Sequence, residues 1–533
     1  MLVYGDQRER VSTRMRIAEL EARREATRAI PGCVERHGAL CGLFIDWAGL
    51  VQGIADAQFA AQREDDQNPT VHALMKELIL VARQVLTSWE SDFRAAPIRP
   101  LAVPSHLPST IEVKLPEGFA FYALYPEAYA LAARRLRLSG PPLVIGLRSI
   151  GTGLAAMVAA ALGVQSAVTL RPEGDPFDRH IVVSEKLEKQ LLARADTHYI
   201  IVDEGPGLSG SSFGAVADWL EVRGVDPARI AFLPGHGGAL GPRASDAHRQ
   251  RWASAQRPVM TGDELLAEQL PRWVEKLTGP IEGPLEDISG GAWRSRRYRD
   301  EREWPAVQPS SERRKFLARS GGSTWLVKFA GLGSIGEDKL DLARKLEGFI
   351  PQPLGLVHGW LIERWHEEAM AGRPNADELA AYLARRVSLP ARQGASLKLL
   401  RAMIARNLPA ARWDFDLARL QPLVRPVVTD GRLAAHEWLR LPCGKPLKCD
   451  ALDHHAAHDL VGCQDIAWDV AAASVELSLD EVLPVDRDLL AFYRLAYLAF
   501  RVGVHRMAAE GLAEWPAEQA RNLAAAQRYE AMV

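Results

Sequence analysis

The sequence predicts an α/β protein with an open parallel sheet in the middle of the chain, an α+β unit in the carboxyl half and a helical segment at the start. Three observations lead to this prediction. Between residues 143 and 238, short apolar runs end in Gly-rich loops and continue into helical patterns, as parallel strands joined by helices do. Residues 315–329 read as a strand, a Gly-Gly turn and a second strand, which is a hairpin pattern. Residues 15–89 carry apolar side chains at helical spacing.

Length and composition narrow the class of protein. A chain of 533 residues is too long for one core. The net charge of −2 gives no sign of a nucleic-acid or anionic-membrane surface, and the most apolar stretch, 153–164, is too short to span a bilayer. Five scattered cysteines and a start without an apolar signal core favour the cytoplasm. We expect small-molecule substrates, no nucleic-acid or membrane partner, and leave a homodimer open.

Composition shifts divide the chain into four parts. A proline-rich stretch at 95–109 ends a helical segment, and the Gly-Pro and Gly-Gly pairs between 279 and 291 precede a dense charged run. We therefore expect a helical segment at 1–100, an α/β domain at 101–278, a linker at 279–311 and a second domain at 312–533.

The strongest site pattern lies in the α/β domain. The uncharged run Tyr199 to Val202 predicts a buried parallel strand. Asp203 and Glu204 stand at its carboxyl end and are followed by a loop of Gly, Pro and Ser that leads into a helical pattern. Such a loop presents backbone N–H groups and the positive end of a helix dipole to an anion. The two carboxylates are good acceptors for ribose hydroxyls.

This order of strand, acid pair, loop and helix resembles the phosphoribosyl-diphosphate signature of the type I phosphoribosyltransferases. The resemblance implies that Asp203 and Glu204 hold the ribose as catalytic residues and that the loop cradles the 5′-phosphate. The loop residues concerned are Gly205, Gly207, Leu208, Ser209, Gly210, Ser211 and Ser212. Pro206 and the serines in place of threonines depart from the family pattern. The alternative is an ordinary Gly-rich turn between a strand and a helix.

A second strand–loop–helix unit comes earlier in the chain. The strand 143–147 leads into a loop and the helix 154–162. The family resemblance implies that this loop grips the pyrophosphate, with phosphoribosyl diphosphate and Mg²⁺ as ligands, because it offers a cation, hydroxyls and open backbone N–H groups. The residues concerned are Arg148, Ser149, Gly151 and Thr152, with Arg148 as a catalytic residue. The turn-rich stretch 171–180 is either a hood over this site or a solvated hairpin tip.

The carboxyl half opens with a different pattern. Lys328 closes an apolar strand, which is unfavourable for an ammonium unless an anion or carboxylate meets it. This hairpin, a helix with acids and the strand 360–365 together resemble the small lobe of the aminoglycoside-phosphotransferase type of kinase, a two-lobed fold. The resemblance implies that Lys328 holds the phosphates of ATP and pairs with Glu337 or, on sequence separation, Glu347. Residues 363–365 would be the adenine hinge.

The same resemblance implies a large lobe with a catalytic Asp, an Asn about five residues later and a metal-binding Asp. Asp430 is the candidate base and Asp450 the candidate Mg²⁺ ligand, and residues 462–471 resemble the helix start that follows. No His-Gly precedes Asp430, and the expected Asn is missing. A crowded set of His and Cys residues between 443 and 463 offers zinc ligands, although its spacing matches no common zinc module.

Two functional hypotheses follow. The first is an enzyme that transfers ribosyl phosphate from phosphoribosyl diphosphate to a base or amine, coupled to an ATP-dependent small-molecule phosphotransferase. The second is a non-catalytic, nucleotide-sensing or regulatory protein with a degenerate kinase lobe. The missing Asn and the unusual Pro206 motivate the second hypothesis.

Overall fold

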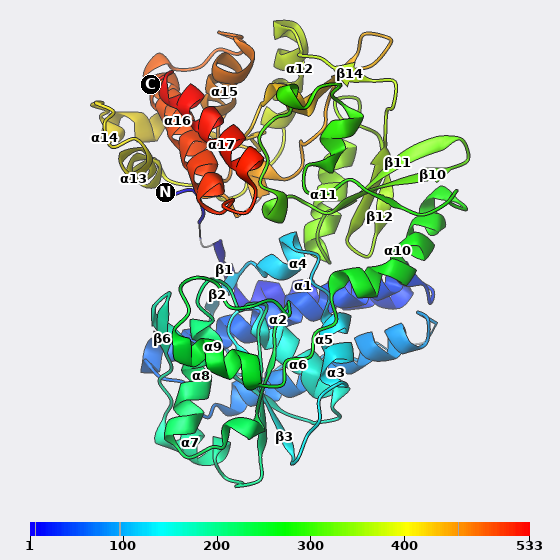
Figure 1. The fold of residues 1–533 in the computed structure, drawn as a ribbon, viewed down its shortest axis with the longest axis vertical. Coiled ribbons are helices and arrows are strands. Elements are labelled where there is room, and N and C mark those ends of the chain that lie inside the picture. Colours follow the sequence, from blue (N-terminus) through cyan, green and yellow to red (C-terminus); the bar gives the residue numbers. More distant parts are fainter. Residues whose placement is uncertain (6, 95–97, 457) are drawn as a thin grey trace.

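The computed structural model describes residues 1–5, 7–94, 98–456 and 458–533. Its elements form two bodies, one around a parallel sheet and one around an antiparallel sheet and a helical bundle, and α10 (Gly262–Thr278) lies at their junction (Figure 1). The amino-terminal helices belong to the first body and the carboxyl-terminal helices to the second (Figure 1).

The first body is built on a four-stranded parallel sheet, which confirms the predicted open parallel sheet. The strand order is β4 (Ala167–Leu170), β3 (Pro142–Leu147), β7 (His198–Val202) and β8 (Ile230–Leu233). Every residue of β7 is buried, which is why this strand reads as an almost continuous apolar run. The helices that follow β3 and β7 are α6 (Gly151–Ala161) and α8 (Ser211–Val222).

Three long helices precede the sheet, as the apolar spacing predicts. They are α1 (Thr13–Ala29), α2 (Val34–Gln62) and α3 (Pro69–Glu90). The Asn68 side chain caps α3 and Pro69 occupies its first turn, both favoured at a helix start. By length and composition α2 could cross a membrane, but 83% of its most apolar window is buried inside the molecule, as in a core helix.

Shorter elements complete the first body. They are β1 (Arg8–Ser12), β2 (Thr110–Lys114), α4 (Glu117–Phe121), α5 (Pro126–Ala133), β5 (Glu173–Asp175), β6 (Asp178–His180), α7 (Glu185–Leu191) and α9 (Asp246–Ser254). The stretch 171–180, expected as either a hood or a hairpin tip, contains the antiparallel pair β5–β6.

The second body begins with a five-stranded antiparallel sheet. Its order is β12 (Pro353–Val357), β13 (Trp360–Arg364), β11 (Ser323–Phe329), β10 (Lys315–Ser320) and β9 (Glu286–Asp287). The predicted hairpin is β10–β11, and its turn uses Gly321 and Gly322 at φ of 57° and 71°, values that a two-residue hairpin turn requires. The helix α11 (Ser334–Lys345) lies between β11 and β12 in the chain. Residues 279–311, expected as a linker, supply β9 and three short 3-10 turns.

The remainder of the second body is mainly helical. Its elements are β14 (Met370–Ala371), α12 (Ala376–Val387), α13 (Leu397–Asn407), α14 (Leu417–Leu420), β15 (Pro426–Val427), β16 (Trp438–Arg440), β17 (Pro446–Lys448), β18 (Gln464–Asp465), α15 (Ala467–Leu477), α16 (Arg487–Glu510) and α17 (Pro516–Glu530). These helices surround a core of their own.

The antiparallel sheet lies between two hydrophobic cores, and its strands alternate accordingly. Val327, Phe329 and Trp360 share a core with α2, α3 and α6 of the first body. Because successive side chains of a strand point to opposite faces, Lys328 and Glu363 point away from that core. The helical segment, the parallel sheet and the antiparallel sheet therefore pack on one another.

Candidate functional site

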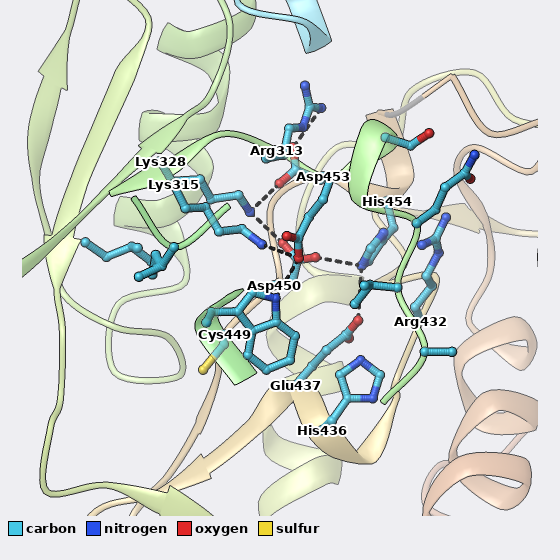
Figure 2. Close-up of a pocket in the computed structure, with 18 of the residues that line it drawn as sticks. Arg313, Lys315, Lys328, Arg432, His436, Glu437, Cys449, Asp450, Asp453 and His454 are labelled. Carbon is cyan, nitrogen blue, oxygen red and sulfur yellow. Dashed lines mark hydrogen bonds and ion pairs between the residues drawn. The ribbon is translucent and has the colours of Figure 1, made fainter. Parts of the chain in front are cut away.

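A cavity of about 330 Å³ lies on the opposite face of the antiparallel sheet. Lys328 of β11 and Glu363 of β13 form one wall, and Asp450 and Asp453, which follow β17, form the other. Figure 2 shows Asp450 and Asp453 with Lys328 on one side and His454 on the other. The alternation of the strands explains the position of Lys328, which the sequence analysis selected.

Lys328 is the centre of a buried charge cluster. Its ammonium donates to Asp450 Oδ1 at 2.5 Å and to Asp453 Oδ2 at 2.7 Å. Asp453 also accepts from Lys339 Nζ of α11 at 2.6 Å and from Arg313 at 3.1 Å. Burial alone would raise the pKa of Asp453, but Lys328, Lys339 and Arg313 hold it well below its usual range. Both acids are therefore ionised at neutral pH.

The predicted partners of Lys328 lie elsewhere. Glu347 is exposed, because α11 ends at Lys345 and the chain turns toward solvent. Glu337 pairs with Arg23 of α1 at 2.7 Å. The helix presents a buried lysine, Lys339, to the cluster in place of an acid. The assignment of Glu347 to the nucleotide site therefore does not fit the structure.

Three side chains in the cavity are placed to share a cation. Glu437, Asp450 and His454 each offer a ligand atom, and these atoms lie within 4.8 Å of one another. Glu437 also accepts from Lys448 Nζ at 2.7 Å. Carboxylate oxygens are the ligands that Mg²⁺ prefers, so the position of Asp450 fits the predicted role. Of the His and Cys residues between 443 and 463, His454 alone joins such a group among the described residues.

Asp430, the predicted base, lies outside the cavity. Its side chain is fully buried, accepts from the Tyr382 hydroxyl at 2.5 Å and lies 3.7 Å from Arg386. The Asp469 carboxylate accepts from the backbone N–H groups of Asp430 and Gly431 at 2.7 and 3.0 Å. These contacts anchor the loop from within, so a role for Asp430 as a base on substrate does not fit its position.

The same loop reaches the cavity two residues later. Arg432, His436 and Glu437 line it. Arg432 binds Asp459 at 2.6 Å. Arg432 and Glu437 are five residues apart, which is the separation that the kinase resemblance implies between a catalytic Asp and the Asn after it. Arg432 and Glu437 are thus the residues of this loop whose side chains reach the cavity together with His436.

Several residues of the expected linker also line the cavity, and two of them with long polar or aromatic side chains were not selected from the sequence. They are Trp293 and Arg297. The Arg297 guanidinium lies 3.8 Å from the centre of the Trp365 ring and donates to the His366 carbonyl at 2.7 Å. Glu363, in the expected hinge, is buried, and burial raises its pKa to about 7. The sequence offered one sign of these lining residues, which is the tryptophan directly before the dense charged run.

The acid pair of the parallel sheet lies at the carboxyl end of β7, as predicted. Glu204 accepts from the Gly118 N–H of α4 at 2.8 Å, and the Tyr129 hydroxyl donates to the Asp203 carbonyl at 2.9 Å. Both side chains are partly buried. Burial raises the pKa of Asp203 to about 7, and burial together with Asp203 raises the pKa of Glu204 to about 8. The pair is thus partly protonated near neutrality.

The following loop is packed beneath the β5–β6 hairpin. Gly207 and Leu208 are exposed, Gly205 and Ser212 are partly buried, and Ser209, Gly210 and Ser211 are buried. The Ser209 hydroxyl donates to Ser211 Oγ at 2.9 Å, and the Ser211 hydroxyl donates to the Pro176 carbonyl at 2.8 Å. The hydroxyls of Ser209 and Ser211, which were predicted to bind phosphate, are therefore used in hydrogen bonds within the loop and to the turn of the β5–β6 hairpin.

The loop 148–152, predicted to bind pyrophosphate, also makes its contacts inside the protein. Arg148 is buried against Asp65 and lies 3.3 Å from Asp56, so its charge is already matched and the predicted pyrophosphate role does not fit. A Cβ on Gly151 would lie 2.8 Å from the Val202 carbonyl oxygen. The close approach of the loop to β7 therefore accounts for a glycine at this position without a bound phosphate. Thr152 is buried and Ser149 partly buried.

The pH dependence of the free energy of unfolding tests whether Glu204 is buried beside Asp203 as described. Because its pKa rises from 4.5 to about 8 on folding, the folded state binds more protons between these values, and stability falls as the pH rises through them. Replacing Glu204 with glutamine should remove the contribution of Glu204 to this slope, so that the variant is more stable than the wild type at pH 8.5 by about 4 kcal/mol. Urea unfolding from pH 5 to 9 would measure it. Parallel curves for the two proteins would contradict the buried acid pair.

Comparisons with known proteins were made for the whole chain. No family model and no curated protein matches the sequence. The choline kinase LicA from Streptococcus pneumoniae matches at 18% identity and TM-score 0.28, over 41% of this chain and 89% of that chain. LicA in complex with AMP matches at 15% identity and TM-score 0.31, over 50% and 99%. The spectinomycin phosphotransferase APH(9)-Ia in complex with ADP and spectinomycin matches at 15% identity and TM-score 0.33, over 50% and 94%.

About half of the chain is thus similar to kinase-like phosphotransferase structures. No comparison supports a phosphoribosyltransferase domain at 101–278. Similarities this low leave the activity to be argued from the residues of the cavity.

Proposed function

We propose that the carboxyl half binds ATP with a divalent cation in this cavity and transfers a phosphoryl group to a small-molecule acceptor. The observation that carries the proposal is the contact of Lys328 with Asp450 beside Glu437. A buried ammonium next to an acidic cation site is the arrangement that a triphosphate and its metal need. When bound, the cation would neutralise the phosphate charge.

The residues of the cavity have separate tasks in this proposal. Lys328 contacts the phosphates, and Asp450 and Glu437 hold the cation. The Asp450 side chain suits this task because it is 36% exposed, whereas that of Asp453 is 9% exposed. Arg432 lines the cavity on the loop that holds Asp430. Phosphoryl transfer depends mainly on positioning and charge stabilisation, so a cation at this point can assist the transfer.

A second candidate function is nucleotide sensing without turnover. The specific observation in its favour is the same Arg432: among the residues that the structure describes, this arginine and not a carboxylate lines the cavity at that point of the loop. Steady release of ADP in the presence of an acceptor panel would separate the two functions. Nucleotide binding without ADP release would favour sensing.

For the parallel sheet we propose ribosyl-phosphate binding, without transfer, at the loop that follows Asp203 and Glu204. The support is the placement of both acids at the carboxyl edge of a parallel sheet, where ligands of such sheets bind. Titration calorimetry with phosphoribosyl diphosphate on the wild type and on Asp203→Asn would test this. Equal binding by the two proteins would remove the proposal.

The cation site gives the direct test of the main proposal. Asp450→Asn removes one of the two carboxylates that would hold the cation, and we expect Mg²⁺-dependent ATP affinity to fall at least about 100-fold, in line with loss of a charged contact worth about 3 kcal/mol. Calorimetry with ATP, with and without Mg²⁺, measures this. Glu347→Gln is the matched control because Glu347 is exposed and away from the cavity. Equal affinities in all three proteins would overturn the proposal.

A further inference from the structure

A second group of potential metal ligands lies outside the cavity, in the shared core of the two bodies. It comprises His37, Cys41, Glu127 and His358, called here the buried His–Cys–Glu cluster. One ligand atom of each residue lies within 4.8 Å of those of the others. The side chains of His37, Glu127 and His358 are fully enclosed. The four residues come from α2, α5 and the turn between β12 and β13.

The distances within the cluster approach those of a tetrahedral metal site. Glu127 Oε1 lies 2.8 Å from His37 Nε2 and 3.0 Å from Cys41 Sγ. It lies 3.5 Å from His358 Nε2, and the Cys41 sulfur lies 3.7 Å from His37 Nε2. Zinc bonds of about 2.0–2.3 Å would place ligand atoms about 3.3–3.8 Å apart. Small side-chain adjustments therefore suffice to admit the ion.

The hydrogen bonding of the cluster is incomplete. Glu127 Oε2 and both ring nitrogens of His358 have no hydrogen-bond partner among the residues that the structure describes. Buried polar atoms are nearly always paired, so the unpaired Glu127 Oε2 and the unpaired His358 Nε2, which lies 3.5 Å from Glu127, point to a ligand between these two side chains. By contrast, His37 Nδ1 contacts the Ser88 hydroxyl at 3.0 Å. Such a second contact orients a metal-binding imidazole.

The position of His358 is an independent indication. It occupies a two-residue turn with Gly359, between the paired residues Val357 and Trp360. Both turn residues have positive φ, 39° for His358 and 91° for Gly359. Such turns strongly favour asparagine, aspartate or glycine at the first position. A histidine here places an imidazole in the core at the cost of an unfavourable backbone conformation.

Charge balance favours a divalent cation. A thiolate and a carboxylate bring two negative charges, which one Zn²⁺ neutralises, while both imidazoles stay neutral. The surroundings require such neutrality, because the rings of Trp89, Phe93 and Trp273 lie within 4.8–5.7 Å of the two histidines. An unmatched charge in this setting is strongly unfavourable. Zinc binds histidine nitrogen, cysteine sulfur and carboxylate oxygen, and a closed set of four protein ligands is the arrangement of a structural rather than a catalytic zinc site.

We propose that the buried His–Cys–Glu cluster binds one structural zinc ion, which ties α2 and α5 of the first body to the β12–β13 turn of the second. On binding, the Cys41 thiol gives up its proton, so that sulfur binds as thiolate. The proton leaves to solvent. The ion joins three segments that are distant in sequence and thereby fixes how the two bodies meet.

The experiment is metal analysis of the full chain, purified with a tag that contains no histidine. We expect about one zinc per chain in the wild type and a tenth or less of that amount in Cys41→Ser and His358→Gln. Cys33→Ser is the matched control, since Cys33 is close in sequence and outside the cluster, and Asp450→Asn excludes the cavity as the source. Both controls should keep the zinc. Equal zinc in all variants, or another metal in its place, would overturn the proposal.

A wild-type measurement protects the test against variants that fail to fold. Removing zinc with a chelator should lower the Tm, and Zn²⁺, but not Mg²⁺, should restore it. Cobalt loading should give a thiolate charge-transfer band in the wild type and Cys33→Ser, and none in Cys41→Ser. Ser88→Ala should lose zinc to the chelator about tenfold more readily. A chain that is free of zinc as purified and shows no change in Tm on adding Zn²⁺ would refute the site.

Discussion

Replacing Lys328 with methionine is expected to destabilise the folded protein by about 3–5 kcal/mol at pH 7, the usual cost of removing one partner from a buried ion pair. Lys328 is 7% exposed and contacts two ionised acids, Asp450 and Asp453. Methionine fills the space of the lysine stem but leaves both carboxylates without their shared cation. Urea unfolding at pH 7 measures the change. ATP affinity should fall by at least about 100-fold in the same protein.

The pH dependence distinguishes this electrostatic cause from poor packing. Lys328 holds the pKa values of Asp450 and Asp453 below the ordinary carboxyl range. The stability gained from these depressed values is present above the unfolded pKa of about 4 and is lost as the pH falls through the folded values. The gap between wild type and variant should therefore be widest above pH 4 and shrink as the pH falls below about 4. A constant gap would indicate a packing defect.

A second substitution controls for the surplus charge. Lys328→Met combined with Asp450→Asn removes the cation together with the acid that contacts no other lysine or arginine among the described ion pairs. This double variant should recover part of the lost stability, because one fewer charge is left unmatched. Lys345→Met is the matched single control, since Lys345 is exposed at the end of α11. If the double variant were less stable than Lys328→Met by the full effect of Asp450→Asn alone, the two side chains would not be coupled.

Sequence reasoning predicted the elements of the fold whose pattern is local. The parallel strands were visible because both of their faces are buried, which leaves unbroken apolar runs such as Tyr199 to Val202. The β10–β11 hairpin was visible because its turn needs positive φ, and Gly321 and Gly322 supply it. The packing of the amino-terminal helices against both sheets was not predictable, because α2 is buried on nearly all sides and shows no polar face.

The candidate site was predictable only where a residue type is unusual for its element. Lys328 in an apolar strand is such a residue, and the structure places it in the cavity. Asp430 was selected by its place in a motif, yet a motif does not say which side of the loop faces the cavity. Arg432 and Glu437 face it instead. The partners of Lys328 could not be foreseen, since Asp450 and Asp453 lie more than 100 residues away.

The buried His–Cys–Glu cluster shows the same limit more sharply. His37 and Cys41 are four residues apart on one helix and therefore share a face. Glu127 and His358 come from positions about 90 and 320 residues later in the chain. No local pattern links them, because tertiary packing alone brings these four side chains together. The proximity of these four side chains was therefore not predictable from the sequence.

Replacing Asp430 with alanine should destabilise the second body by about 3–5 kcal/mol. Asp430 is fully buried and lies beside the equally buried Arg386 and Lys448. Arg386 also donates to the carbonyls of Val428 and Thr429, so it holds the strand that leads to the loop. Without the carboxylate, two buried cations lose a negative neighbour and the Tyr382 hydroxyl loses its acceptor. Urea unfolding would record the loss.

Asp430→Asn separates this anchoring role from catalysis. Asparagine keeps the shape and one oxygen acceptor for Tyr382, so we expect a smaller loss of stability, about 1–3 kcal/mol. ATP affinity should stay within about threefold, because Asp430 does not line the cavity. A base that contacts substrate would behave in the opposite way: stability and ATP binding would be preserved, and any measured phosphoryl transfer would fall by about 100-fold or more. That result would return Asp430 to the role that its motif indicated and would require the loop to turn toward the cavity.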